Sequence, residues 1–166
     1  MKTLKLISLK LGIIYLVLLE VPAFSQSKLI KQIALDQFSA MNAHDIPKIC
    51  AAYAATASIE SPNFPSAKIG PSGIKEVYSR YFAATPDLHF TLKHLFVNDS
   101  TAILEYTVAG TFSNPEPGTP EYMKGKKYSS ETCTIFEIRN GMIVRSASYF
   151  DQVAFLRQTG FFDHNK

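Results

Sequence analysis

The sequence has no tryptophan, only two cysteines and only four histidines among its 166 residues. The two cysteines, Cys50 and Cys133, stand far apart, and neither has a pair of histidines close to it in sequence. Zinc sites in proteins are usually built from closely spaced Cys and His ligands, and no two histidines here have that spacing. The sequence therefore predicts no metal site.

Two redox states of Cys50 and Cys133 remain open from the sequence. A disulfide between them would be compatible with an exported protein, because oxidising compartments preserve such bonds. The alternative is two separate thiols, each buried as a small apolar side chain. The wide separation of the two residues favours the separate thiols.

The excess of positive over negative charge is also small. The sequence has 17 Lys and Arg and 14 Asp and Glu, which gives a net charge of +3. Three of the lysines and one of the glutamates fall within residues 1–25, so the remaining chain carries a net charge of +1. No stripe of basic residues is left that would follow a phosphate backbone. We therefore expect no nucleic acid as a partner.

Residues 1–25 have the organisation of a secretory signal peptide. A lysine-rich start leads into an apolar run over residues 11–19, and Pro22 and small residues precede a cleavage position ahead of Gln26. An uncleaved membrane anchor is the alternative, but the run is shorter than the roughly 20 apolar residues that a span needs. The sequence predicts export to the periplasm or medium, cleavage that leaves no stable membrane anchor, and one mature domain, residues 26–166.

Apolar residues recur every three or four positions in some segments and every two positions in others, which distinguishes helices from strands. The expected helices cover residues 28–43, 46–53, 73–84 and 153–158, and the expected strands cover 56–61, 88–96, 101–112, 127–139 and 142–151. Asn140-Gly141 is the strongest hairpin signal, because both central residues of that turn need positive φ. Helices followed by an antiparallel meander indicate an α+β fold.

His94 falls on the otherwise apolar face that alternation predicts for residues 88–96, together with Leu92 and Phe96. A single histidine on such a face has two interpretations. It can be a hydrogen-bonded residue of the core, or it can act as a proton donor or acceptor in a site.

Several short words in the sequence carry a family resemblance. They are Phe82-Ala-Ala-Thr-Pro-Asp-Leu-His-Phe90, Ala109-Gly-Thr111, Phe136-Glu-Ile-Arg-Asn-Gly-Met-Ile-Val144, Tyr149-Phe-Asp-Gln152 and Leu156-Arg-Gln-Thr-Gly160. In this order and spacing, over about residues 28–161, the chain resembles the SnoaL-like polyketide cyclases of the nuclear transport factor 2-like superfamily. The resemblance implies a cone-shaped, strongly curved antiparallel sheet, with N-terminal helices closing an apolar pocket. It also implies that the protein self-associates, as a homodimer, through the outer face of the sheet.

The resemblance further implies a reaction and a catalytic residue. Cyclases of this family close a ring by aldol condensation without a cofactor, with an aspartate as acid and base, and the matching position here is Asp151. An apolar pocket would raise the pKa of such a carboxyl and make it a better base, while Tyr106, Tyr149 or His94 would donate to the developing oxyanion. Asp151 has a second interpretation, as the cap of a helix that begins at Gln152.

Two positions depart from the family pattern. Phe112 stands where the family often has a histidine, and Ser148 stands where it often has a second aspartate. Both departures remove partners of the proposed base. The sequence thus leaves an exported cyclase or isomerase acting on a small apolar carbonyl compound, a non-catalytic protein that binds a small apolar molecule, and an association module.

Overall fold

The computed structural model describes residues 23–163, with side chains from Gln26 onward. The predicted signal peptide covers residues 1–25, so nearly all of it lies outside the described residues. The first helix, α1, already begins at Ala23. Cleavage and export therefore stay predictions.

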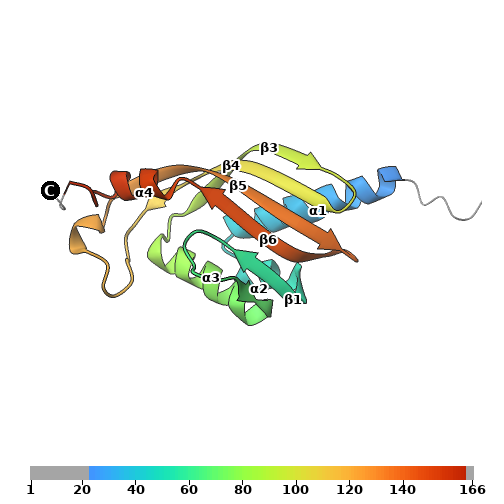
Figure 1. Cartoon of the computed structure of the whole chain (residues 1–166), viewed down its shortest axis with the longest axis horizontal. Helices are drawn as coiled ribbons and strands as arrows, with labels where there is room; N and C mark the ends of the chain where they lie inside the picture. Colours follow the sequence, from blue (N-terminus) through green and yellow to red (C-terminus); the bar gives the residue numbers. More distant parts are fainter. Residues whose placement is uncertain (1–22, 164–166) are drawn as a thin grey trace, which may run out of the picture.

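The described chain forms four α-helices, one short 3₁₀ helix and six strands (Figure 1). The helices are α1 (Ala23–Asn42), α2 (Ile46–Ala51), α3 (Gly70–Ala84), α4 (Gln152–Gln158) and the 3₁₀ turn η2 (Glu121–Met123). The strands are β1 (Tyr53–Glu60), β2 (Lys68–Ile69), β3 (His89–Val97), β4 (Thr101–Thr111), β5 (Lys127–Arg139) and β6 (Met142–Phe150). The predicted elements are present, β2 was not predicted, and α3 begins three residues earlier than expected.

The strands make one curled, open sheet in the order β2-β1-β6-β5-β4-β3. From β3 to β6 the sheet is an antiparallel meander, and the β5–β6 turn is the predicted Asn140-Gly141 hairpin, with φ of 51° and 75°. The remaining long strand, β1, lies parallel to β6. The meander begins with β3 at the far edge of the sheet and comes back strand by strand, so its last strand, β6, lies beside β1. The predicted α+β class and curved sheet are confirmed, with this one parallel pair as the exception to an antiparallel sheet.

A β-bulge in β3 changes the face that its second half presents. Leu92 pairs with Tyr106, but the next paired residue, His94, stands opposite Glu105, so Lys93 is an extra residue. One inserted residue shifts the alternation, and every later side chain then points to the opposite face. The prediction that His94 shares the inner, apolar face with Leu92 is therefore wrong.

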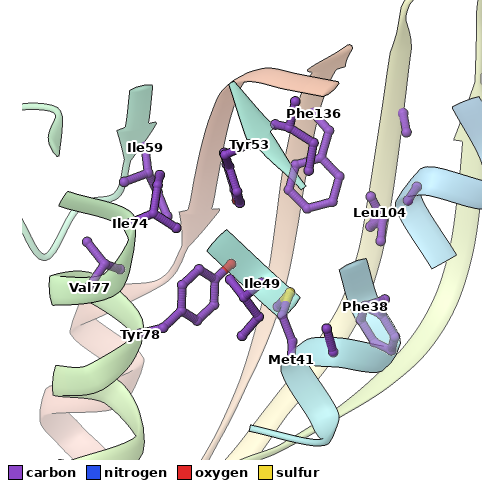
Figure 2. Packing of buried hydrophobic residues seen from close by; sticks show 14 of the residues in the cluster. Phe38, Met41, Ile49, Tyr53, Ile59, Ile74, Val77, Tyr78, Leu104 and Phe136 are labelled. Carbon is purple, nitrogen blue, oxygen red and sulfur yellow. The ribbon is translucent and has the colours of Figure 1, made fainter. Parts of the chain in front are cut away.

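The inner face of the sheet, defined here as the face covered by α1, α2 and α3, carries the core. Ile49 and Ile74 from the helices belong to one buried cluster with Leu104 and Phe136 from the strands (Figure 2). Ile143 of β6 belongs to the same cluster, and all five are almost fully buried. Burial of each such side chain contributes about 1.5–3 kcal/mol. This packing fixes the helices against the sheet near the Asn140-Gly141 end of β5 and β6.

Two of the short segments that carry the family resemblance meet at the C-terminal end of β4, away from the Asn140-Gly141 hairpin. A Cβ atom at Gly110 would lie 2.3 Å from Cγ2 of Thr85, so only glycine allows this close approach. The Asp87 carboxylate accepts hydrogen bonds from the Thr111 amide at 2.7 Å and the Thr111 hydroxyl at 2.8 Å. These bonds hold the pKa of Asp87 below its ordinary value. The words around Thr85 and Gly110 thus have a structural role, which is to join the end of α3 to the sheet.

Candidate functional site

A cavity of about 320 Å³ opens on the inner face of the sheet, at the end opposite the packed core. Its wall includes the C-terminal half of α3, the connection from β1 to β2, the inner faces of β4 to β6, and α4. The loop over residues 112–126 lies at the same end of the molecule as α4 (Figure 1). The apolar lining includes Phe64, Phe90, Val108, Phe112 and Phe155. The expected apolar pocket is therefore present.

Hydroxyl groups form one wall of this cavity. The Tyr106 hydroxyl lies 2.8 Å from Oγ1 of Thr134, which in turn lies 2.8 Å from Oγ of Ser148. Ser130 and Thr132, on the same face of β5, also line the cavity. Burial raises the pKa of Tyr106, so its phenol stays neutral and can donate a hydrogen bond.

A second set of hydroxyls lies along the α3 side. The Tyr81 hydroxyl is 3.1 Å from Oγ of Ser61 and accepts a 3.3 Å hydrogen bond from Nδ2 of Asn63. The Tyr128 hydroxyl is 3.0 Å from Oγ1 of Thr85. Burial raises the pKa of both tyrosines, so this side also presents neutral polar groups.

Helix α4 closes the cavity beyond the C-terminal end of β6. Gln158 fixes the helix to β5, because its amide accepts from the Ser129 N–H and donates to the Ser129 carbonyl, both at 2.8 Å. This places the Phe155 ring edge-on against Tyr128, with centroids 5.0 Å apart, and against Phe112, with centroids 5.7 Å apart. The segment over residues 156–160, which carries part of the family resemblance, therefore anchors the helix whose Phe155 lines the cavity.

Asp151 begins this helix and its carboxylate turns away from the cavity. It accepts a 3.0 Å hydrogen bond from the Ala154 amide, is exposed, and is absent from the cavity lining. This is the helix-cap arrangement that the sequence left open as an alternative. The catalytic role of Asp151 stays a prediction.

The other three predicted site residues are not gathered around Asp151. Tyr106 lines the cavity, as described above. His94 lies on the outer face, where its Nδ1 is 3.0 Å from Oε2 of Glu105 and its side chain is 63% exposed. Tyr149 is also outside, with 53% of its surface exposed. Neither His94 nor Tyr149 lines the cavity. Of the three predicted hydrogen-bond donors, Tyr106 is therefore the one placed to donate to a molecule in the cavity.

An ion pair that the sequence analysis missed stands in the cavity wall. The Arg80 guanidinium binds both carboxylate oxygens of Glu116, with Nη2 2.7 Å from Oε2 and Nε bonded to Oε1. The same guanidinium lies over the Phe64 ring, 4.9 Å from its centroid. Each charge stabilises the other, so the pKa of Glu116 is lowered and that of Arg80 is raised. Because 36 residues separate the two, no local pattern in the sequence indicates the pair.

The chemistry that the cavity can perform is limited by its lining. Apart from Arg80, Glu116 and tyrosines, the cavity wall in residues 23–163 has no ionisable side chain. Within the same residues, no three His, Cys, Asp or Glu side chains are grouped to hold a metal ion. Apart from this ion pair, the cavity is therefore lined by neutral donors and acceptors and by aromatic side chains.

The two cysteines and the helices bear on two further expectations. Cys50 and Cys133 are separate free thiols, as one interpretation predicted, but each is half-buried rather than buried. Burial raises the pKa of the Cys50 thiol. None of the helices between Ala23 and Gln158 has both the length and the apolar character needed to cross a membrane.

Solved structures with this fold are numerous and distant in sequence. A proposed SnoaL-like polyketide cyclase from Jannaschia sp. CCS1 superposes with a TM-score of 0.73 at 13% identity, covering 81% of this chain and 93% of its own. IdmH, a proposed polyketide cyclase from Streptomyces antibioticus, gives 0.66 at 21% identity, covering 78% and 97%. A protein with a ketosteroid isomerase-like fold from Catenulispora acidiphila, in complex with trimethylamine, gives 0.65 at 16% identity, covering 77% and 92%. These likenesses establish the fold.

Among curated proteins, none matches this sequence. The model of the SnoaL-like domain family matches residues 34–146, which is more than half of the chain. This range includes Arg80, Tyr106, Glu116 and most of the hydroxyl wall, and it ends before Asp151. The match confirms the resemblance seen in the sequence, and the chain belongs to the SnoaL-like domain family.

Proposed function

We propose that the mature chain is an exported protein that binds a small, largely apolar molecule in this cavity without transforming it. One observation carries the proposal. The cavity combines aromatic walls with neutral hydroxyls, and in the described residues its wall has no carboxylate, histidine or lysine apart from Glu116, which is already paired with Arg80. Aldol and isomerase reactions need a base beside a weakly acidic C–H bond. Binding needs no such group.

The size and polarity of the cavity suit a small guest. Ligand sites in proteins usually fall in the range of about 300–1,000 Å³ and combine apolar walls with a few convergent polar groups. Here Tyr106, Ser130 and Thr132 offer hydroxyls to a carbonyl or hydroxyl on the guest, while Phe90 and Phe155 pack against its body. The trimethylamine complex of the Catenulispora acidiphila protein supports a small-molecule pocket in this fold.

Native mass spectrometry of the protein purified from its own host tests the proposal. We expect a population carrying a noncovalent adduct, which denaturation releases as an organic compound. That compound should be recovered chemically unchanged after prolonged incubation with fresh protein. A compound that is converted would contradict the non-catalytic proposal. Sequencing the N-terminus of the secreted or periplasmic protein, expected to begin at Gln26, tests export independently.

A cyclase or isomerase is the second candidate, and membership of the SnoaL-like domain family favours it. In this proposal Asp151 acts as acid and base on a small apolar carbonyl compound, with Tyr106 as oxyanion donor. The carboxylate would have to leave the Ala154 amide that it now caps. Asp151→Asn is a sharp test, because asparagine preserves a helix cap but cannot act as a base. We expect turnover to be lost while the fold persists, and unchanged turnover would end this candidate.

We also propose, from the family resemblance, that two copies associate through the outer face of the sheet. Phe96 and Tyr149 are exposed there at 59% and 53%. Exposed aromatic side chains of this size are typical of association surfaces. Light scattering at high protein concentration should give the mass of a dimer, and a monomer there would contradict the proposal.

A further inference from the structure

We propose that Arg80 is the binding site for a carboxylate on the guest, and that Glu116 occupies this site in the empty protein. The inference rests on the proposed small-molecule function and names the chemical class of the guest. That class is a monocarboxylic acid with an apolar, ring-bearing body. The ion pair between Arg80 and Glu116 lies in the cavity wall itself, so an incoming acid would meet it directly.

Arg80 is held in position by contacts other than Glu116. It projects from α3, an element fixed by the buried residues Ile74 and Val77. Its guanidinium lies over the Phe64 ring, and a cation in that position is attracted by the electron-rich face of the ring. The planar guanidinium therefore keeps its orientation when Glu116 leaves, and a carboxylate can bind it through two parallel hydrogen bonds.

Glu116 can be displaced at low cost. Its side chain is 49% exposed and that of Arg80 is 39% exposed, so water reaches both charges and weakens their attraction. Glu116 sits in a polar loop, two residues before Gly118, whose φ is 90°. The base of this loop is anchored separately, because Asn114 bonds the carbonyls of Ala83 and Ala84 at 3.1 and 3.0 Å. The tip can therefore move while the base stays in place.

The charges around Phe64 favour an anion once Glu116 has moved. Lys68 also lies over this ring, with Nζ 5.8 Å from the centroid, and it pairs with Glu76 at 2.8 Å. Without Glu116, the group comprises two cations, Arg80 and Lys68, and one anion, Glu76. A guest carboxylate restores the balance, whereas a neutral guest has no charge to exchange for that of Glu116. The site therefore selects acids over neutral compounds of the same shape.

Isothermal titration calorimetry with 2-naphthoate and 2-naphthamide at neutral pH tests the inference. The two probes share one apolar body and differ in charge. We expect the wild-type protein to bind the acid about two- to fivefold more tightly, which is the range of one exposed ion pair. Arg80→Gln should abolish this preference. Glu116→Gln should widen this preference about two- to fivefold, because the carboxylate that competes with the acid for Arg80 is gone.

Glu121→Gln is the matched control. Glu121 is in the same loop, pairs with Lys124 at 3.5 Å, and does not line the cavity. Its substitution removes the same charge, so equal gains in Glu121→Gln and Glu116→Gln would overturn the inference. Equal wild-type affinities for the two probes would also overturn it, while leaving the pocket function intact. A wild-type protein that binds neither probe would overturn both proposals together.

Discussion

The two ends of the inner face of the sheet are built from the same strands but differ in what fills them. Toward the Asn140-Gly141 hairpin, β5 presents Phe136 and Ile138, and both are almost fully buried in the core cluster. Toward α4, the same face of β5 presents Thr132, Ser130 and Tyr128, and the space above them is hollow. The first end is a core and the second is a binding cavity.

This difference shows at which residue of a strand the packed core ends and the cavity begins. Alternate residues of β5 point inward, so the inner face can be read from the sequence as Tyr128, Ser130, Thr132, Thr134, Phe136 and Ile138. A hydroxyl buried without a partner is costly, so a hydroxyl-rich stretch does not pack tightly in a dry core. The change at Thr134 marks the border, and Tyr106 on β4 stands beside it, bonded to Thr134.

Strand β4 crosses this border and offers a matched series on one face. Leu104 is 1% exposed and lies in the packed end, whereas Val108 lines the cavity. Leu104→Ala should lower the free energy of unfolding by about 2–5 kcal/mol, because it leaves a void in close packing. Val108→Ala, which enlarges an existing space, should cost less than about 1 kcal/mol. Urea unfolding measures both, and equal losses would contradict the division into two ends.

Alkaline pH should destabilise the protein through its buried tyrosines. Tyr53, Tyr78, Tyr81, Tyr106 and Tyr128 all have a pKa raised above the ordinary value by burial. Such groups keep their protons in the folded state after the unfolded chain has begun to lose them. Above about pH 10, where the phenols of the unfolded chain lose their protons, each should lower the free energy of unfolding as the pH rises, with no loss from this source below that pH. Urea unfolding from neutral pH to pH 11 would show this decline, and a flat profile would contradict the burial of these phenols.

Tyr106→Phe probes the border itself and should have the smallest effect. It removes the hydroxyl that bonds Thr134 at 2.8 Å, while Thr134 keeps its bond to Ser148. We expect a loss of about 0.5–1.5 kcal/mol in the free energy of unfolding. The affinity for 2-naphthamide should also fall, because a donor is gone from the cavity wall. A loss as large as that of Leu104→Ala would place Tyr106 in the core rather than at its border.

Most of the fold could be predicted because its signals are local. Helix and strand periods, the Asn140-Gly141 turn and the order of elements are each carried by a few neighbouring residues. Two features were not local. The pairing of β1 with β6 depends on how the whole meander folds back beside β1. The bulge at Lys93 interrupts the alternation of faces in β3, although the period-two pattern of the sequence continues through it.

The site was predicted less well than the fold, for two physical reasons. Asp151 satisfies the requirements of a helix cap and of a pocket base equally in sequence, and only the direction of its carboxylate separates them. Arg80 and Glu116 come together through tertiary structure across 36 residues. The hydroxyls of β5 were open to prediction, since alternation alone places Ser130 and Thr132 on the face of Phe136.

Filling the cavity tests the central claim, that this end of the sheet is hollow and holds a guest. Ser130→Phe puts a large ring into the cavity, whereas Ser129→Phe puts the same ring on the opposite, exposed face of the same strand. The measurement is calorimetric titration of both variants with 2-naphthamide, after circular dichroism has shown that each is folded. We predict that Ser130→Phe loses binding and Ser129→Phe retains the wild-type affinity. Equal affinities in the two variants would contradict the account.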